Sequence, residues 1–135
     1  MPAKRRVLIA EDDRSVRDLI RTYLQMAGHE ILIAHDGAEA LEQVRSAKPD
    51  AMILDINMPE VDGFTVLKTL SETALPILPV LVLTARHAVV DVRRCITLGA
   101  RDYLAKPFTE VQLTARVARL LRTLSQMEEA RKTAV

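Results

Sequence analysis

The 135-residue sequence is poor in several residue types, and each shortage narrows the possible folds and environments. It has no tryptophan, and aromatic residues make up only 3% of a chain that is 49% hydrophobic, so the core must be built from aliphatic side chains. Cys95 is the only cysteine, which excludes an intramolecular disulfide and fits a reducing compartment. We therefore expect a cytoplasmic protein in which Cys95 is a small buried hydrophobic residue.

The chain also lacks a strong net charge and any long apolar run. Its 19 basic and 18 acidic residues leave a net charge of +1, which provides no bulk attraction to nucleic acid or to a membrane surface. No apolar stretch approaches the roughly 20 residues of a membrane span, and the apolar segment after the basic N-terminus is too short for a signal peptide. We expect no direct contact with nucleic acid and none with a membrane.

What the sequence does contain is an alternation of strand and helix patterns. Short apolar runs typical of buried parallel strands are each followed by apolar residues at helical spacing. The strand patterns cover residues 7–10, 30–34, 51–54, 80–83 and 102–105. This (βα)5 order predicts an α/β fold, a doubly wound parallel five-stranded sheet with helices on both faces. The flavodoxin-like strand order 2-1-3-4-5 would place the first and third strands side by side, although that order follows from the fold class and not from the residues alone.

Four of the apolar runs end on residues that can handle a phosphoryl group. The carboxyl ends of parallel strands meet at one edge of a sheet, so these side chains should converge on one pocket. They are Glu11, Asp12 and Asp13 after the first run, Asp55 after the third, Thr84 after the fourth and Lys106 after the fifth. Taken singly, each has a simpler interpretation as a helix cap, a turn residue or a strand former. Together they indicate a site for Mg²⁺ and phosphoryl transfer.

Each chemical role in phosphoryl transfer has a candidate among these residues. Asp55 stands at a central strand end, where its carboxylate can attack as a nucleophile and form an aspartyl phosphate. Asp12 and Asp13 are adjacent carboxylates of the kind that Mg²⁺ prefers. Lys106 offers a point charge for a phosphoryl oxygen or for the acceptor carboxylate, and Thr84 offers a hydroxyl donor. We therefore predict Asp55, Thr84 and Lys106 as the catalytic residues.

The motifs at the strand ends resemble those of response regulator receiver domains, over roughly residues 6–124. They are Val7-Leu8-Ile9-Ala10-Glu11-Asp12-Asp13, Asp55-Ile56-Asn57-Met58-Pro59-Glu60-Val61-Asp62-Gly63, Leu83-Thr84-Ala85 and Gly99-Ala100-Arg101-Asp102-Tyr103-Leu104-Ala105-Lys106-Pro107-Phe108. The resemblance implies a bacterial two-component switch in which a histidine kinase, or a histidine phosphotransfer protein, phosphorylates Asp55 in the presence of Mg²⁺. It implies metal ligation by Asp13, Asp55 and the backbone carbonyl of Asn57, with Asp12 acting mainly through water.

The resemblance also implies how phosphorylation is read out. The Thr84 hydroxyl would turn toward the phosphoryl group and the Tyr103 ring would move inward behind it, which makes the pair a two-state switch. Many winged-helix regulators of this superfamily dimerise through a charged face, but Arg101, Val111 and Gln112 stand where its acids are common. We therefore expect a monomer or weak dimer that binds a different, unknown downstream protein.

The last helix carries a stripe of Arg116, Arg119 and Arg122 at spacings of three residues. Such a stripe is usually a solvated helix face, and the functional alternative is a docking surface for an acidic partner.

The organisation of the chain favours a stand-alone switch. We expect a receiver domain at residues 1–124 and a short polar C-terminal tail at residues 125–135, with no output domain. The alternative is the receiver half of a truncated DNA-binding regulator. A haloacid-dehalogenase-type phosphatase shares the Asp, Mg²⁺, Thr and Lys, but it needs a second acid two residues after the nucleophile, where this chain has Asn57. We therefore expect a phosphoacceptor and not a free-standing enzyme.

Overall fold

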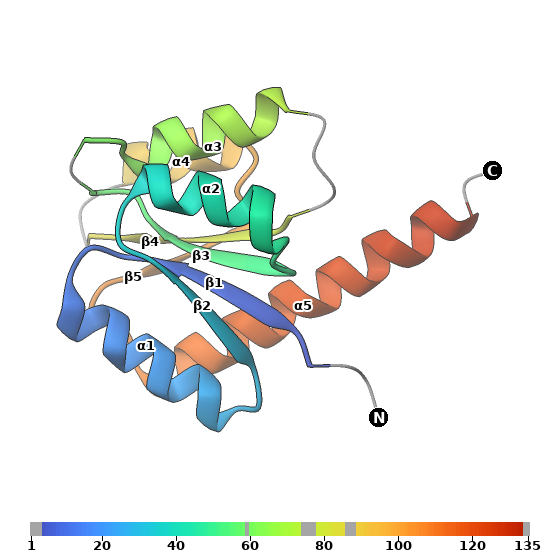
Figure 1. Ribbon diagram of the computed structural model, residues 1–135, viewed down its shortest axis with the longest axis horizontal. Coiled ribbons are helices and arrows are strands. Elements are labelled where there is room, and N and C mark those ends of the chain that lie inside the picture. Colours follow the sequence, from blue (N-terminus) through green and yellow to red (C-terminus); the bar gives the residue numbers. More distant parts are fainter. Residues whose placement is uncertain (1–3, 59, 74–77, 86–88, 134–135) are drawn as a thin grey trace.

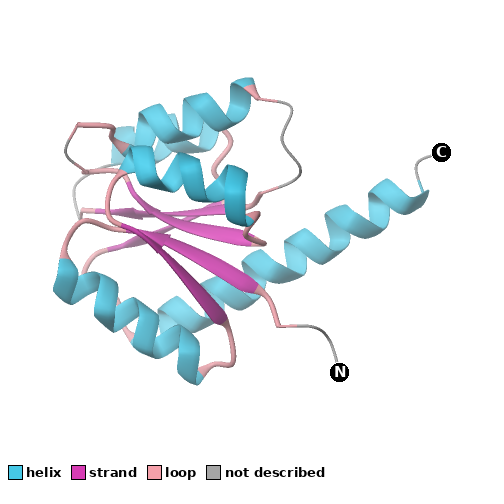
Figure 2. Cartoon of the chain, in the orientation of Figure 1, coloured by secondary structure: helices cyan, strands magenta, loops and turns pink. Residues whose placement is uncertain are grey.

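Five strands and five helices alternate along the chain in a computed structural model, which describes residues 4–58, 60–73, 78–85 and 89–133 (Figures 1 and 2). In chain order the elements are β1 (Arg6–Ala10), α1 (Arg14–Met26), β2 (Glu30–Ala34), α2 (Gly37–Ala47), β3 (Ala51–Asp55), α3 (Gly63–Glu72), β4 (Val80–Thr84), α4 (Val89–Thr97), β5 (Asp102–Ala105) and α5 (Glu110–Thr133). All strand pairs are parallel, and their order is β2-β1-β3-β4-β5. The predicted α/β fold and strand order are confirmed.

Both faces of the sheet carry an aliphatic core. Successive residues of a strand point to opposite faces, so Leu8 and Met52 pack on the side of α2, α3 and α4, while Ile9 and Ile53 pack on the side of α1 and α5. Figure 1 shows this three-layer arrangement, with α1 and α5 below the sheet and the other helices above it. Every residue of β3 and β4 is buried, which explains why these strands are continuous apolar runs in the sequence.

The strand register brings the polar strand ends together. Ala10 of β1 pairs with Leu54 of β3, so the acids that follow each of them lie side by side at the carboxyl edge. On the other side of β3, Asp55 pairs with Leu83, directly before Thr84. The same edge therefore collects chain segments that are far apart in the sequence.

Helix α5 extends into the residues that the sequence analysis expected as a polar tail. Residues 125–133, expected as a tail, are polar and mostly exposed but form the last part of this helix, which projects beyond the sheet (Figure 1). Strong helix formers such as Met, Glu, Ala, Arg and Lys predominate there. Arg5 also donates hydrogen bonds to Ser125 Oγ at 3.2 Å and Glu128 Oε1 at 3.1 Å, which ties the first part of the extension to the start of β1.

Candidate functional site

Three acids gather at the carboxyl ends of β1 and β3. Glu11, Asp12 and Asp55 each place a carboxylate oxygen within 4.8 Å of those of the other two. Glu11 and Asp55 are buried, whereas Asp12 is exposed, so the cluster can be reached from solvent on one side. The pairing of β1 with β3 is what brings the cluster together.

The acidic cluster fits a divalent cation. The Oε2 atom of Glu11 is buried and has no hydrogen-bond partner among the described residues. An unpartnered buried carboxylate oxygen is costly, and a bound cation would supply the partner. Carboxylate oxygens are also the ligands that Mg²⁺ prefers. The donor set therefore suits the predicted metal.

Asp13, predicted as a metal ligand, has a different contact in this structure. It is the N-cap of α1, and its carboxylate accepts a hydrogen bond from the Val16 N–H at 3.1 Å. Glu11 takes the place in the cluster that the sequence analysis assigned to Asp13. The capping role of Asp13 could have been predicted from the sequence, because the residue directly before a helix is the one that caps it.

Lys106 reaches the acidic cluster from the loop after β5. Its Nζ donates a hydrogen bond to Glu11 Oε1 at 2.9 Å and lies 3.6 Å from Asp55 Oδ2. The peptide bond between Lys106 and Pro107 is cis. The lysine thus contacts two of the three acids, Glu11 and Asp55.

Burial and the neighbouring charges change the pKa values of Glu11 and Lys106. Burial, together with the neighbouring Asp55 carboxylate, raises the pKa of Glu11 to about 8, and the contact with Lys106 offsets only part of this rise. Burial alone would lower the pKa of Lys106, but the hydrogen bond to Glu11 and the charge of Asp55 outweigh it and raise that pKa. In the metal-free site, burial thus favours the neutral form of Glu11, while the two neighbouring acids favour the charged form of Lys106.

The Asp55 carboxylate is buried and held in place. It is 3% exposed, and its Oδ1 accepts the N–H of Asn57 at 3.0 Å. The loop after Asn57 returns to this point at Gly63, whose N–H donates to the Ile56 carbonyl at 3.2 Å. A Cβ on Gly63 would lie 2.5 Å from the Ile56 Cα and 2.9 Å from the Asp55 carbonyl oxygen, so only glycine fits here.

The predicted switch residues flank the site on β4 and β5. Thr84 is 2% exposed, and its hydroxyl donates to the Ala85 carbonyl at 3.3 Å. Tyr103 is 44% exposed, so its ring lies outward on β5. Beside it, Asp102 pairs with Arg116 at 2.8 Å and also with Arg119. Two arginines of the predicted stripe are thus partnered within the domain, which the sequence analysis did not foresee.

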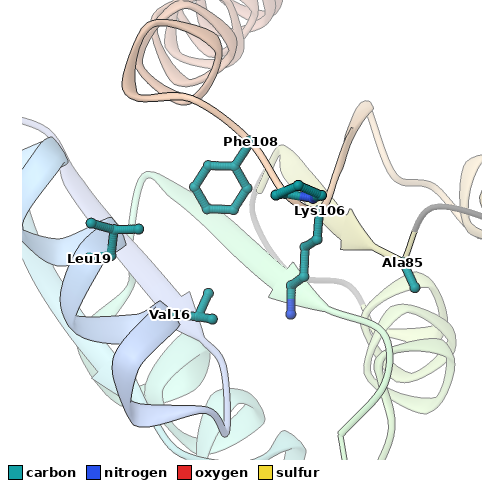
Figure 3. Close-up of a pocket in the computed structure, with 6 residues that line it drawn as sticks. Val16, Leu19, Ala85, Lys106 and Phe108 are labelled. Atoms are coloured by element: carbon teal, nitrogen blue, oxygen red, sulfur yellow. The ribbon is translucent and has the colours of Figure 1, made fainter.

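A cavity of about 360 Å³ opens beside Lys106. It is lined by Val16, Leu19, Ala85, Lys106, Pro107 and Phe108 (Figure 3). Its walls are apolar apart from the lysine, whose side chain lies between Val16 and Ala85 in the close-up view. The cavity therefore places a hydrophobic surface next to the charged site.

No helix in the described part of the chain is long and apolar enough to cross a membrane.

Comparison with known proteins shows the same family over most of the chain. The model of the response regulator receiver domain matches residues 7–118. Response regulator MprA of Mycobacterium avium (strain 104) is 42% identical over 130 residues, which cover 96% of this chain and 57% of that protein. The chain thus spans little more than half the length of this curated relative.

Solved structures agree with the sequence match. The chemotaxis protein CheY4 of Vibrio cholerae is 33% identical with a TM-score of 0.82, covering 88% of this chain and all (100%) of that one. NtrX from Brucella abortus is 27% identical with a TM-score of 0.90, covering 96% of this chain and 29% of that one. With its parallel sheet, its buried aspartate and its strand-end lysine, this chain belongs to the response regulator receiver domain family, the phosphorylation-dependent switches of two-component signalling.

Proposed function

We propose that Asp55 is the phosphoryl acceptor of this receiver domain. The observation that carries the proposal is the setting of its buried carboxylate. One oxygen is held by the Asn57 N–H at 3.0 Å, and the other lies 3.6 Å from the Lys106 ammonium. A carboxylate fixed in this way is oriented for attack, and the lysine offsets the negative charge of an incoming phosphoryl group.

The residues around Asp55 would bind the metal ion and stabilise the charge of the phosphoryl group. The Asp55 carboxylate oxygen attacks the phosphorus of a phosphohistidine on the donor protein, and the bond from phosphorus to the histidine nitrogen breaks. Glu11, Asp12 and Asp55, together with the Asn57 carbonyl that the family resemblance implies, would hold Mg²⁺, which would supply charge neutralisation on the phosphoryl oxygens. Lys106 lies close enough to move from Glu11 to a phosphoryl oxygen. Asp13 stays outside this set as the cap of α1.

The donor that fits the surface is a protein carrying a phosphohistidine, namely a histidine kinase or a phosphotransfer protein. The support is the apolar cavity beside Lys106, because exposed apolar surface of this kind is typical of protein contacts. Leu19, which is 41% exposed, lines this cavity and carries no polar side-chain atom. Leu19→Glu should slow transfer from a protein donor and leave labelling by acetyl phosphate unchanged. Equal loss with both donors would argue against docking at this surface.

Thr84 and Tyr103 are the proposed readout. In the present arrangement, the Thr84 hydroxyl donates to the Ala85 carbonyl and the Tyr103 side chain is exposed. A phosphoryl group on Asp55 would draw the hydroxyl toward itself, which opens room for the ring. The surface formed by α4, β5 and α5 changes as a result, and a downstream protein that prefers one state binds it.

The acceptor assignment is tested by chemical labelling. The protein is incubated with acetyl phosphate and Mg²⁺, and the acyl phosphate is reduced with borohydride and located by mass spectrometry. We expect a single modified residue, Asp55, with no labelling of Asp55→Asn and normal labelling of Asp13→Asn. Full labelling of Asp55→Asn, or modification of Asp12, would overturn the assignment.

The length of the relatives favours a second candidate for the downstream target. Because the chain spans 57% of MprA, it is also a candidate for the receiver part of a longer regulator. In that case the target surface would lie in the same polypeptide and not in a separate protein. The mass of the protein in its native cells, detected with an antibody against α5, distinguishes the two.

A further inference from the structure

Arg17 is a buried arginine one turn into α1. It is only 9% exposed, whereas the side chains of the other charged residues of that helix, Arg14, Asp18 and Arg21, are 87%, 42% and 44% exposed. Its side-chain hydrogen bonds in the described structure go to two backbone carbonyls, from Nη1 to Glu11 O at 3.0 Å and to Asp12 O at 3.4 Å. A buried guanidinium is retained only where its donors are well satisfied. The role of Arg17 therefore concerns the loop that these carbonyls belong to.

That loop contains only Glu11, Asp12 and Asp13, and Arg17 contacts the backbone of all three. Besides its two side-chain bonds, Arg17 donates its own N–H to the Asp13 carbonyl at 2.9 Å. At the other end, the Glu11 N–H donates to the Ala34 carbonyl at 3.3 Å. The peptide planes of the loop are thus held from α1 and from β2. Since the direction of a side chain follows its backbone, these bonds also set where the acidic groups of Glu11 and Asp12 point.

We propose that Arg17 is a positioning residue, which holds Glu11 and Asp12 in the arrangement that binds the divalent cation. The inference rests on the proposed function, because it assumes that these acids serve a metal ion. Residues that orient metal ligands in this way commonly change metal affinity 10- to 100-fold when they are replaced. Arg17 would thereby support phosphorylation of Asp55 without contacting the reacting atoms.

Two effects of replacing Arg17 would change the Mg²⁺ affinity in opposite directions, namely the loss of its charge and the loss of its contacts with the loop. A positive group next to the acids repels a cation, so removing the charge alone would tighten Mg²⁺ binding. Removing the carbonyl contacts would instead let the loop relax and would weaken binding. The direction of the change in Mg²⁺ affinity therefore separates the two roles.

The test measures the Mg²⁺ dissociation constant of the full chain by calorimetry. Arg17→Met removes the charge and the contacts, and Arg17→Lys keeps the charge but replaces the planar fork with a single ammonium. Arg14→Met is the matched control, because Arg14 lies on the same helix, has an 87% exposed side chain and, among the described residues, pairs only with Asp18. We expect Mg²⁺ binding about tenfold weaker in Arg17→Met, weaker by a smaller factor in Arg17→Lys, and unchanged or slightly tighter in Arg14→Met.

The phosphorylation rate gives a second readout. For a positioning residue, the rate that Arg17→Met loses at low Mg²⁺ should return as Mg²⁺ is raised, whereas Asp55→Asn should stay inactive throughout. Wild-type or tighter Mg²⁺ affinity in Arg17→Met overturns the proposal. If that variant does not fold, Arg17→Lys decides in the same way. Failure to label Asp55 in the wild type would refute the proposed acceptor, while the Mg²⁺ titration would still report on Arg17.

Discussion

At the scale of single residues, the site depends on which of three consecutive acids faces the pocket. Glu11 and Asp12 join Asp55, whereas Asp13 turns to the first N–H groups of α1. The bounds of the two elements explain the difference, because β1 ends at Ala10 and α1 begins at Arg14, which leaves Asp13 directly before the helix. The residue directly before a helix is needed as its cap. Two acids therefore remain for the cluster.

Mg²⁺ should stabilise the wild type and Asp13→Asn, but should stabilise Asp12→Asn much less. A ligand that binds only the folded state at a hundredfold excess over its dissociation constant adds about 2.7 kcal/mol to the free energy of unfolding. Asp13→Asn is a matched control, because asparagine caps helices as well as aspartate does and the charge change is the same. The measurement is the melting temperature with and without Mg²⁺. Loss of the Mg²⁺ effect in Asp13→Asn would restore Asp13 as a ligand.

The raised pKa of Glu11 predicts a pH dependence of stability in the metal-free protein. Folding raises this pKa from 4.5 to about 8, so the folded state binds the proton more tightly than the unfolded state does. The resulting stabilisation is complete below about pH 4.5 and is lost as the pH rises toward 8. Glu11→Gln, which stays neutral, should lack this decline.

Urea unfolding at several pH values in the presence of a chelator measures the effect. The exposed Glu42→Gln serves as control and should follow the wild type. Parallel pH curves for the wild type and Glu11→Gln would contradict the assignment of the titration to Glu11.

At the scale of the elements, the junction of β3 and α3 holds the acceptor loop in place. Gly63 opens α3 and lies against the backbone of Asp55 and Ile56, where there is no room for a Cβ. Asp62 caps the same helix by accepting the Thr65 N–H at 2.9 Å. The loop that begins at the acceptor is therefore closed by close backbone packing at the start of α3.

Gly63→Ala should disturb this junction. The added methyl must push the Asp55 loop or α3 aside, and overpacking of this kind costs about 1–3 kcal/mol in the free energy of unfolding. We also expect slower labelling of Asp55 by acetyl phosphate, because the carboxylate loses its orientation. Lys68→Ala, at an exposed position of α3, should leave both unchanged. Wild-type stability and labelling in Gly63→Ala would show that the loop adapts without affecting the acceptor.

At the scale of the whole molecule, the site on one sheet edge is connected to a distant surface through two neighbouring strands. Thr84 of β4 pairs with Ala105 of β5, two residues after Tyr103. On the same surface, Arg116 of α5 donates to the Tyr103 carbonyl at 2.9 Å and pairs with Asp102. A movement of Tyr103 would thus act on β5 and α5 together.

Beryllofluoride, as a mimic of the phosphoryl group, should change hydrogen exchange across residues 89–108 and leave β1 and β3 unchanged. We expect the bound protein to sediment mainly as a monomer, because Arg101, Val111 and Gln112 replace the acids of the usual dimer face. Exchange is measured by mass spectrometry and association by sedimentation velocity, with Asp55→Asn as control. Unchanged exchange at residues 89–108 would remove the proposed switch, and a tight symmetric dimer would refute the monomer prediction.

The apolar runs and the helical spacings in the sequence were sufficient to predict the (βα)5 order, because burial on both faces of a parallel strand requires continuous apolar residues. The residues at the strand ends were also sufficient to locate the candidate site, since parallel strands carry their ends to one edge. Helix length was not predictable from the apolar stripe alone. Residues 125–133 have no buried side chains, yet helix propensity and the contacts of Arg5 continue α5 to Thr133.

By itself, the sequence therefore determined the fold class, the family and the strand ends at which the candidate site lies, because periodicity and strand-end chemistry are local properties of the chain. Only the tertiary structure decided which acids face one another, that Lys106 bonds to Glu11, and that Arg17 lies beneath the acidic loop. These are contacts between β1, β5 and α1, and they depend on strand pairing and helix packing. No local pattern of residues encodes such distances.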